Sequence, residues 1–241
     1  SFVTTTISSV LTPYLPEIYA PGSTVSIIPS LSVYCDEGIH MLTGLFFAVS
    51  GYLLGSILFA SIISKLFHKD IISKSPDKNY GTANAFRYGG VLCGALTLLC
   101  DMGKGFLPVF IYMHTENPSE VMLPIVLVAP VIGHILPVFS KFKGGKAIAV
   151  TFGSLAGMWP NWTTVLTLCF FFILFMTLIK ITPHCYCTII TYCCTTLVSF
   201  FIEPVKAVSI GMLMITIACS IKMLSVPEER EKFDVRWLWK H

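Results

Sequence analysis

The sequence predicts an all-α integral membrane protein with about seven transmembrane helices, because its composition, its long uncharged stretches and its basic loops agree. Of the 241 residues, 54% are hydrophobic and only 12% are charged, about half the charged fraction of an average soluble domain. Several uncharged stretches reach the roughly 20 residues that a helix needs to cross a bilayer. The basic residues flank these stretches instead of forming a soluble face, so nucleic acid is not an expected partner.

Seven apolar stretches account for most of the chain. The uncharged stretch 147–179 is too long for one ordinary span, and Pro160-Asn161 is expected to divide it into two helices. Four prolines precede residue 30, so we expect residues 1–40 to form an irregular segment outside the membrane. A membrane domain over residues 41–224 and a charged tail over residues 225–241 follow. The predicted spans are residues 41–64, 89–113, 121–140, 147–159, 161–179, 185–202 and 205–224.

The distribution of basic residues predicts the orientation of the chain. Lysine and arginine are concentrated in residues 65–87, in residues 141–146 and in the tail from residue 222, whereas the loop 114–120 holds two glutamates and no basic residue. Cytosolic loops carry an excess of lysine and arginine, so the three basic segments are expected in the cytosol. This places the N-terminus outside and the C-terminus in the cytosol, an alternation that seven crossings satisfy and six do not.

The nine cysteines predict packing and not metal binding. Most of them lie in or beside apolar stretches, and no Cys-x-x-Cys pair occurs. Cys185-x-Cys187 and Cys193-Cys194 lack the spacing of zinc ligands, whereas free cysteine packs as a small apolar side chain. We therefore expect no metal site.

Cations and glycines gather directly after the third predicted span. Glycine allows backbone N–H groups to approach an anion closely, and lysine supplies positive charge. This combination at a membrane boundary predicts a site for a phosphate. The segment holds three lysines around a glycine pair: Lys141, Lys143, Lys146, Gly144 and Gly145.

The first basic loop, residues 75–90, is a second candidate for phosphate binding. It contains two asparagines, three glycines and Arg87, whose planar guanidinium can hold two phosphate oxygens at once. The alternative is a solvated cytosolic loop that only helps to set the topology.

Asp101, Lys104 and His134 lie inside predicted spans, away from their ends or near the cytosolic boundary. Asp101 and Lys104 are three residues apart and share a helix face, so Asp101 either neutralises Lys104 structurally or holds it towards an anionic substrate. His134 either takes a proton from an attacking hydroxyl or is a hydrogen-bonded packing residue. Charges inside spans also occur in channels and transporters, but here they gather at one face, and no second half of the chain mirrors the first.

The motifs together resemble the bacterial acyl-phosphate:glycerol-3-phosphate acyltransferases, the PlsY family, from about Tyr52 to Leu224. The segment 76–87 is similar to the family's first motif, which ends in Asn-x-x-Arg, here Asn84 to Arg87. Asp101-x-x-Lys104 followed by glycine is similar to a second motif. Gly133-His134 through the lysine–glycine loop is similar to the most specific motif, almost residue for residue.

The resemblance implies an enzyme with its active site on the cytosolic face of a bacterial-type plasma membrane. Such enzymes transfer a fatty acyl group from acyl phosphate to glycerol 3-phosphate, giving lysophosphatidic acid and phosphate, and need no cofactor. Besides these two substrates, the expected partners are membrane lipids. The residues expected to be catalytic are Lys104, His134 and Lys146. The residues expected to bind substrate phosphate are Asn79, Gly81, Asn84, Arg87, Lys143, Gly144, Gly145 and Lys146, and Asp101 is expected to form a structural ion pair.

The chain departs from the family pattern at several polar positions. Asp77 stands where the family has a serine, and Lys78 where it has a glycine. The family's carboxy-terminal histidine, asparagine and arginine correspond to Ile217, Ser220 and Met223. Each lost contact can remove about 1–3 kcal/mol of binding or transition-state stabilisation. The second hypothesis is therefore a weakened or inactive relative that binds a phosphorylated lipid or metabolite.

Overall fold

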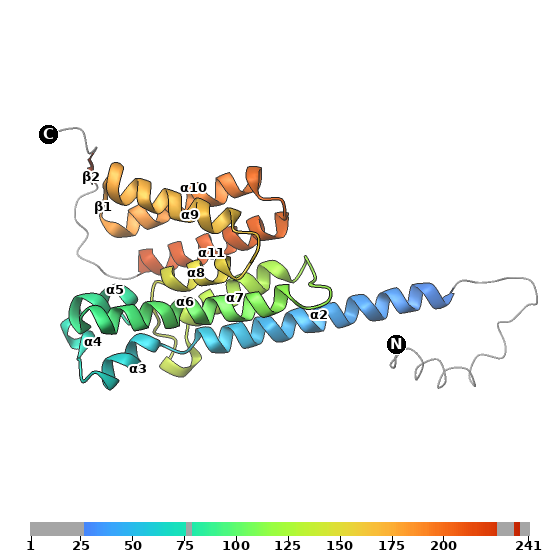
Figure 1. Cartoon of the computed structure of the whole chain (residues 1–241), viewed down its shortest axis with the longest axis horizontal. Coiled ribbons are helices and arrows are strands. Elements are labelled where there is room, and N and C mark those ends of the chain that lie inside the picture. The colour runs from blue at the N-terminus through green and yellow to red at the C-terminus, as the bar shows by residue number, and fades with distance from the viewer. Residues whose placement is uncertain (1–26, 76–78, 226–233, 237–241) are drawn as a thin grey trace, which may run out of the picture.

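The computed structural model describes residues 27–75, 79–225 and 234–236 and shows a layered bundle of helices (Figure 1). Its helices are α2 (Ile27–Gly55), α3 (Phe59–Leu66), α4 (Ile71–Lys74), α5 (Thr82–Asn84), α6 (Val91–Met113), α7 (Leu123–Ile135), α8 (Ile148–Ala156), α9 (Thr163–Ile173), α10 (His184–Ile202) and α11 (Lys206–Ser225). Two π-helical turns, Ala85–Gly89 and Leu174–Leu178, follow α5 and α9, and a 3₁₀ turn, Val138–Ser140, follows α7.

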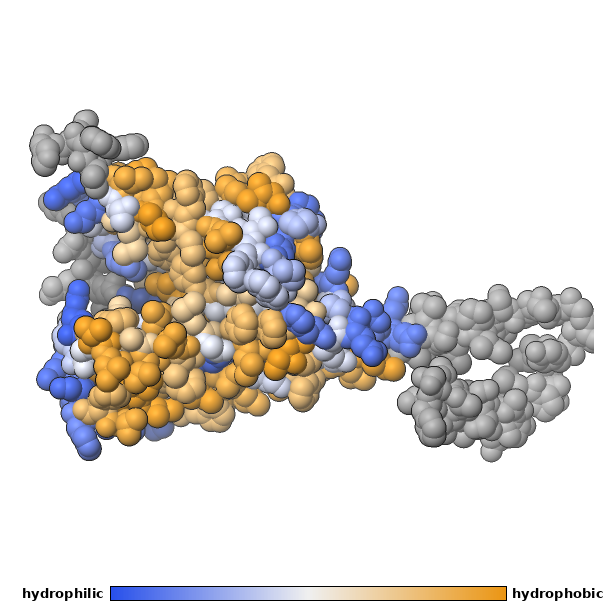
Figure 2. Space-filling view, in the orientation of Figure 1, coloured by the Kyte–Doolittle hydropathy of each residue, from blue (hydrophilic) through white to orange (hydrophobic). Residues whose placement is uncertain are grey.

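The layers follow from which apolar faces pack together. Helix α2 packs on α6 and α7, α6 packs on α8, and α7 packs on α11, which in turn contacts α10 and, through it, α9. The buried core runs through these contacts, with Val126, Leu127 and Met212 at or near zero exposure. Figure 2 shows an apolar band across the outside of the bundle with hydrophilic residues at its ends. An apolar exterior of this kind is what contact with lipid requires.

Five helical segments in the described part of the chain are long and apolar enough to cross a membrane. They are Asp36–Leu66, Val91–Met113, Leu123–Ser140, His184–Ile202 and Lys206–Ser225. The remaining two predicted spans form shorter helices, α8 with nine residues and Thr163–Leu178. Nine residues reach only about 14 Å along a helix, roughly half the hydrocarbon thickness. The count of seven crossings and the orientation of the termini therefore stay predictions.

The division at Pro160-Asn161 is confirmed. Helix α8 ends at Ala156 and α9 begins at Thr163, so the break lies at the predicted place. A proline removes one backbone donor and disfavours helical conformation in the residue before it, which is why the uncharged run does not continue as one helix.

The structure corrects one boundary. Helix α2 begins at Ile27, so residues 27–40 are helical and not irregular as predicted, whereas residues 1–26 lie outside the described residues. Pro29 lies in the first turn of α2, where backbone N–H groups have no partner within the helix, so proline costs little there. The all-helical fold is confirmed, and one short pairing accompanies it: β1 (Ile181–Thr182) pairs antiparallel with β2 (Asp234–Val235), which belongs to the predicted tail.

A buried carboxylate links the start of α9 to the end of α10. Glu203 is 1% exposed and accepts hydrogen bonds from the Thr164 hydroxyl, at 2.6 Å, and from the Asn161 amide. Lys206 donates to the Glu203 backbone carbonyl at 3.1 Å. A buried carboxylate is tolerated only when its oxygens are paired, so this cluster holds α9 against α10. The sequence did not single out Glu203.

Glycines bring α2 and α7 into close backbone contact. A Cβ atom added at Gly133 would overlap the carbonyl of Tyr52, and one added at Gly55 would overlap the carbonyl of Pro130. Small residues at a helix interface allow this approach between membrane helices. The pair of glycines therefore positions α7, which carries His134, against the end of α2.

Gly133→Ala is expected to destabilise the protein by about 1–3 kcal/mol, because the added methyl group has no space and forces α2 and α7 apart. Thermal unfolding of the detergent-solubilised protein measures the effect. Gly103→Ala is the matched control, since a Cβ at Gly103 of α6 meets no atom within 4 Å. Equal melting temperatures for the two variants would contradict the packing role of Gly133.

Candidate active site

A cavity of about 1070 Å³ opens between the segment that carries α5 and α6 on one side and α8, α9 and the start of α10 on the other. Arg87 and Lys146 both line this cavity, although helices α6 and α7 lie between them in the sequence. The predicted site residues that line this cavity are Asn79, Gly81, Asn84, Arg87, Asp101, His134 and Lys146.

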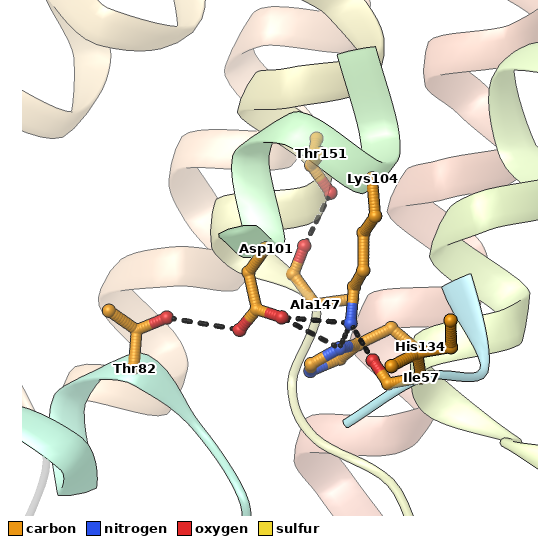
Figure 3. Close-up of polar contacts among 7 residues, drawn as sticks. All are labelled: Ile57, Thr82, Asp101, Lys104, His134, Ala147 and Thr151. Carbon is orange, nitrogen blue, oxygen red and sulfur yellow. Dashed lines mark hydrogen bonds and ion pairs between the residues drawn. The ribbon is translucent and has the colours of Figure 1, made fainter. Parts of the chain in front are cut away.

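A buried network of three ionisable side chains joins α6 to α7 (Figure 3). Two of them, Asp101 and His134, line the cavity, whereas Lys104 is not among the lining residues. The Lys104 ammonium is 2.8 Å from the Asp101 carboxylate and 2.8 Å from Nδ1 of His134. It also donates to the backbone carbonyl of Ile57 at 2.6 Å. All three ionisable side chains are 3% exposed or less. The structural ion pair expected for Asp101 is therefore present, and it includes a histidine from another helix.

The hydrogen bonds of Lys104 determine which protons the network holds. A lysine ammonium has three hydrogens and accepts no hydrogen bond. Here it is hydrogen-bonded to His134 and to the Ile57 carbonyl, and it forms an ion pair with Asp101. Nδ1 of His134 is therefore the acceptor in its bond with Lys104. A neutral imidazole has one donor and one acceptor nitrogen, so Nε2 of His134 carries the hydrogen. This geometry favours His134 as a donor and argues against its predicted role as a base.

The loop before α6 is held by its own asparagine. The Asn84 amide nitrogen donates to the Ser75 hydroxyl and to the Asn79 backbone carbonyl, both at 2.9 Å. Both amide hydrogens are thereby used within the loop. The Thr82 hydroxyl donates to the second oxygen of Asp101 at 3.3 Å and joins the loop to the buried network. Asn84 thus lies in the cavity wall with its amide hydrogens engaged inside the loop, and its contact with substrate phosphate stays a prediction. Arg87 on the adjoining π-helical turn is exposed.

The glycine pair lies against His134 and not on the cavity surface. A Cβ at Gly144 would overlap the His134 carbonyl, and one at Gly145 would overlap the His134 ring. The backbone N–H of Gly145 donates to the His134 carbonyl at 3.1 Å, so this amide is already engaged. Both glycines are buried, and Lys143 is exposed outside the described cavity lining. The loop therefore packs against the histidine. The engaged amide of Gly145 differs from its predicted contact with phosphate, whereas the contact predicted for Gly144 stays a prediction.

Several lining residues were not predicted from the sequence. Thr82 and His184 add polar groups, and His184 stands at the first position of α10. The rest of the unpredicted lining is mainly apolar: Ala83, Phe86, Leu98, Ala147, Ile148, Ala149, Val150, Phe152, Phe172 and Met176. In a chain that is 54% hydrophobic, composition does not distinguish such residues from those that face lipid.

The described residues of α11 contribute nothing to the cavity lining. Ile217, which corresponds to the family's histidine, is 52% exposed, and Met223, which corresponds to the arginine, is buried in the core. Asp77 and Lys78, the departures in the first motif, lie outside the described residues. Eight cysteines whose side chains the structure describes are free: Cys93, Cys100, Cys169, Cys185, Cys187, Cys193, Cys194 and Cys219. Among the described residues, no three His, Cys, Asp or Glu side chains gather as a metal site would require.

These features define a class before any relative is considered. A helical bundle with an apolar exterior and several membrane-spanning helices is a multi-pass membrane protein, and its cavity, lined by basic and apolar side chains, is the candidate site. The family model described as glycerol-3-phosphate acyltransferase matches residues 45–228. The chain belongs to this family, whose members of known structure are called PlsY.

Individual relatives agree with the family. The chain is 44% identical over 119 residues to the glycerol-3-phosphate acyltransferase of Hydrogenobaculum sp. (strain Y04AAS1), covering 49% of this chain and 60% of the relative. It is 39% identical over 116 residues to glycerol-3-phosphate acyltransferase 2 of Thermotoga maritima, covering 48% of this chain and 59% of the relative. The chain thus spans about three fifths of the length of these curated relatives.

Two solved structures share the fold. Both are crystal structures of PlsY (YgiH), an integral membrane glycerol 3-phosphate acyltransferase, and each match covers 74% of this chain and 87% of the other. The lysophosphatidic acid form is 28% identical with a TM-score of 0.62. The glycerol 3-phosphate form is 27% identical with a TM-score of 0.64.

Proposed function

We propose that this protein transfers an acyl group from acyl phosphate to the primary hydroxyl of glycerol 3-phosphate and releases lysophosphatidic acid and phosphate. The observation that carries the proposal is that basic and apolar side chains line one cavity. Arg87 and Lys146 line it beside the Asp101–Lys104–His134 network, and residues such as Phe152 and Phe172 line the rest. A fatty acyl phosphate has the matching combination of a phosphate and an apolar chain.

The solved relatives support this choice of substrates. One PlsY structure is described as its glycerol 3-phosphate form and another as its lysophosphatidic acid form. Both compounds carry a phosphate monoester, and lysophosphatidic acid also carries an acyl chain. The proposed donor is acyl phosphate because its mixed anhydride is already activated, so that the protein needs chiefly to orient two anions and offset their repulsion.

In the proposed reaction, the primary hydroxyl of glycerol 3-phosphate attacks the acyl carbonyl carbon. The carbon–oxygen bond to phosphate breaks, and the bonding electron pair leaves with the phosphate. Arg87 and Lys146 hold the phosphoryl oxygens, and the Nε2 hydrogen of His134 is available as a donor. Because Nδ1 of His134 already accepts from Lys104, the departing phosphate is the better acceptor for the hydroxyl proton.

The proposed site faces the cytosol of a bacterial-type plasma membrane. The basic stretch before α6 supplies Asn79 and Arg87, and the lysine loop before α8 supplies Lys146, so the cavity lies at the basic end of the bundle. Basic loops of membrane proteins are concentrated on the cytosolic side. The proposed topology completes seven crossings with α8 and α9 and leaves the N-terminus outside.

The test is an acyl-transfer assay on the purified full chain. Phosphate is expected to be released from palmitoyl phosphate only when glycerol 3-phosphate is present, with lysophosphatidic acid detected by mass spectrometry in equal amount. Phosphate release that does not depend on glycerol 3-phosphate would indicate hydrolysis and contradict the proposal, as would the absence of any release.

A second candidate is a relative that binds glycerol 3-phosphate without transferring an acyl group. The specific observation in its favour is that α11 adds no described residue to the cavity, while Ile217 is exposed. Calorimetry would distinguish the two candidates: binding of glycerol 3-phosphate without product in the transfer assay favours this one.

A further inference from the structure

The cavity has a definite direction from a polar rim to an apolar end. Lys146 lies just before α8, and Phe152 lies in the second turn of that helix. Phe172 lies on α9, and Met176 lies one turn later, on the π-helical turn that leads to β1. Met176 is 48% exposed, whereas Phe172 is only 9% exposed. Phe152 and Phe172 therefore stand at the end of the cavity that is farther from the chain segments carrying the polar residues.

Phe172 separates this apolar end from the core. Its ring centroid is 5.5 Å from that of Phe152 and 6.1 Å from that of Tyr192, which it meets edge to face at 89°. Tyr192 of α10 is 1% exposed and is not among the residues that line the cavity. The Phe172 ring is thus the partition between the cavity on one side and Tyr192 on the other.

We propose that Phe172 closes the apolar end of the cavity and sets the longest acyl chain that the site accepts. This proposal rests on the proposed acyl transfer, because it concerns the length of the acyl chain that the donor carries. Packed side chains in a core yield little to an added methylene. A single methylene group in an apolar pocket can change substrate discrimination by about 10-fold or more. A rigid aromatic partition therefore distinguishes chains that end before it from chains that reach it.

The test compares two donors, dodecanoyl phosphate and octadecanoyl phosphate, with the full-length protein in detergent. Phe172→Ala extends the cavity towards Tyr192 and is expected to raise the ratio of kcat/KM for the longer over the shorter donor about tenfold. Phe172→Trp shortens the cavity and is expected to lower the same ratio. Phe170→Ala is the matched control, since Phe170 lies on the same helix but is 60% exposed and outside the cavity lining; its ratio is expected to stay at the wild-type value.

The outcomes separate this proposal from the proposed function. If the wild-type chain transfers neither donor, acyl transfer fails, and the partition is then tested by calorimetric binding of dodecyl and octadecyl phosphate to the same variants. If Phe172→Ala does not fold, Phe172→Leu replaces the ring with a smaller side chain and is expected to shift the ratio of kcat/KM for the two donors in the same direction. Unchanged chain-length ratios in the folded Phe172 variants, in turnover or in binding, would overturn the proposal, because the acyl chain would then leave sideways into lipid.

Discussion

Lys104→Met is expected to destabilise the folded protein by about 3–5 kcal/mol, the largest effect on stability among the substitutions considered, because it leaves a buried charge without its partner. The Asp101 carboxylate is 1% exposed and lies 2.8 Å from the Lys104 ammonium. After the substitution, its described polar contacts are the Thr82 hydroxyl, at 3.3 Å, and the more distant Nδ1 of His134, at 3.9 Å. Nδ1 of His134 and the Ile57 carbonyl would also lose their donor. Chemical unfolding in detergent, followed by tryptophan fluorescence, measures the change.

The double variant Asp101→Asn with Lys104→Met is the control for this result. Replacing both members of a buried ion pair by neutral groups is often close to neutral in stability, whereas removing one member is not. The double variant is therefore expected to recover much of the lost stability while failing in acyl transfer. If Lys104→Met were as stable as the wild type, the buried network would not hold the charges that its geometry indicates.

Lys146→Ala is expected to reduce acyl transfer by about 10²–10³-fold, which is the usual loss when one donor to a developing anion is removed. Lys146 and Arg87 line the same cavity, so they are placed to offset the charge of the two phosphate groups in the proposed reaction. The loss should fall mainly on kcat if Lys146 stabilises the departing phosphate, and mainly on KM if it only binds glycerol 3-phosphate. Release of phosphate from palmitoyl phosphate, followed over time, provides both constants.

Lys141→Gln is the matched control for Lys146→Ala. Both lysines belong to the same short loop, but Lys141 is exposed and lies outside the described cavity lining. A general effect of charge at the membrane surface would lower activity in both variants, whereas a specific contact lowers it only in Lys146→Ala. Undiminished turnover of Lys146→Ala would remove the proposed site.

Much of the fold could be predicted because local rules govern it. Helix breaks at proline depend on covalent geometry, so the division near Pro160 could be located from the sequence. The start of α2 could not be located from the sequence. A proline is harmless in the first turn of a helix but breaks a helix further along, and only the structure shows that Pro29 lies in a first turn. The pairing of β1 with β2 joins Thr182 to Asp234, which are 52 positions apart, and nothing local to either segment indicates the other.

The sequence predicted the charged residues of the candidate site but not the contacts and apolar residues that shape its cavity. Charges in an apolar chain are costly and so draw attention to themselves, which is why Asp101, His134 and Lys146 were found. Gly144 and Gly145 were also noticed, but their contact with His134 depends on how the loop folds back onto α7. Phe172 carries no such signal, because an apolar residue against a cavity and one against lipid look alike in a sequence.

From its residue types and their order alone, this chain was identifiable as a membrane protein with a candidate phosphate site among basic residues, since burying charge and breaking helices carry large local costs. The family was indicated separately, by the resemblance of its motifs. Which of those residues meet was decided by packing between distant segments. The loop before α6 and the loop before α8 line the same cavity because helices α6 and α8 pack against each other. Neither loop sequence indicates this helix contact. The network of Lys104 with His134, the engaged amide of Gly145 and the partition formed by Phe172 all arise from that packing.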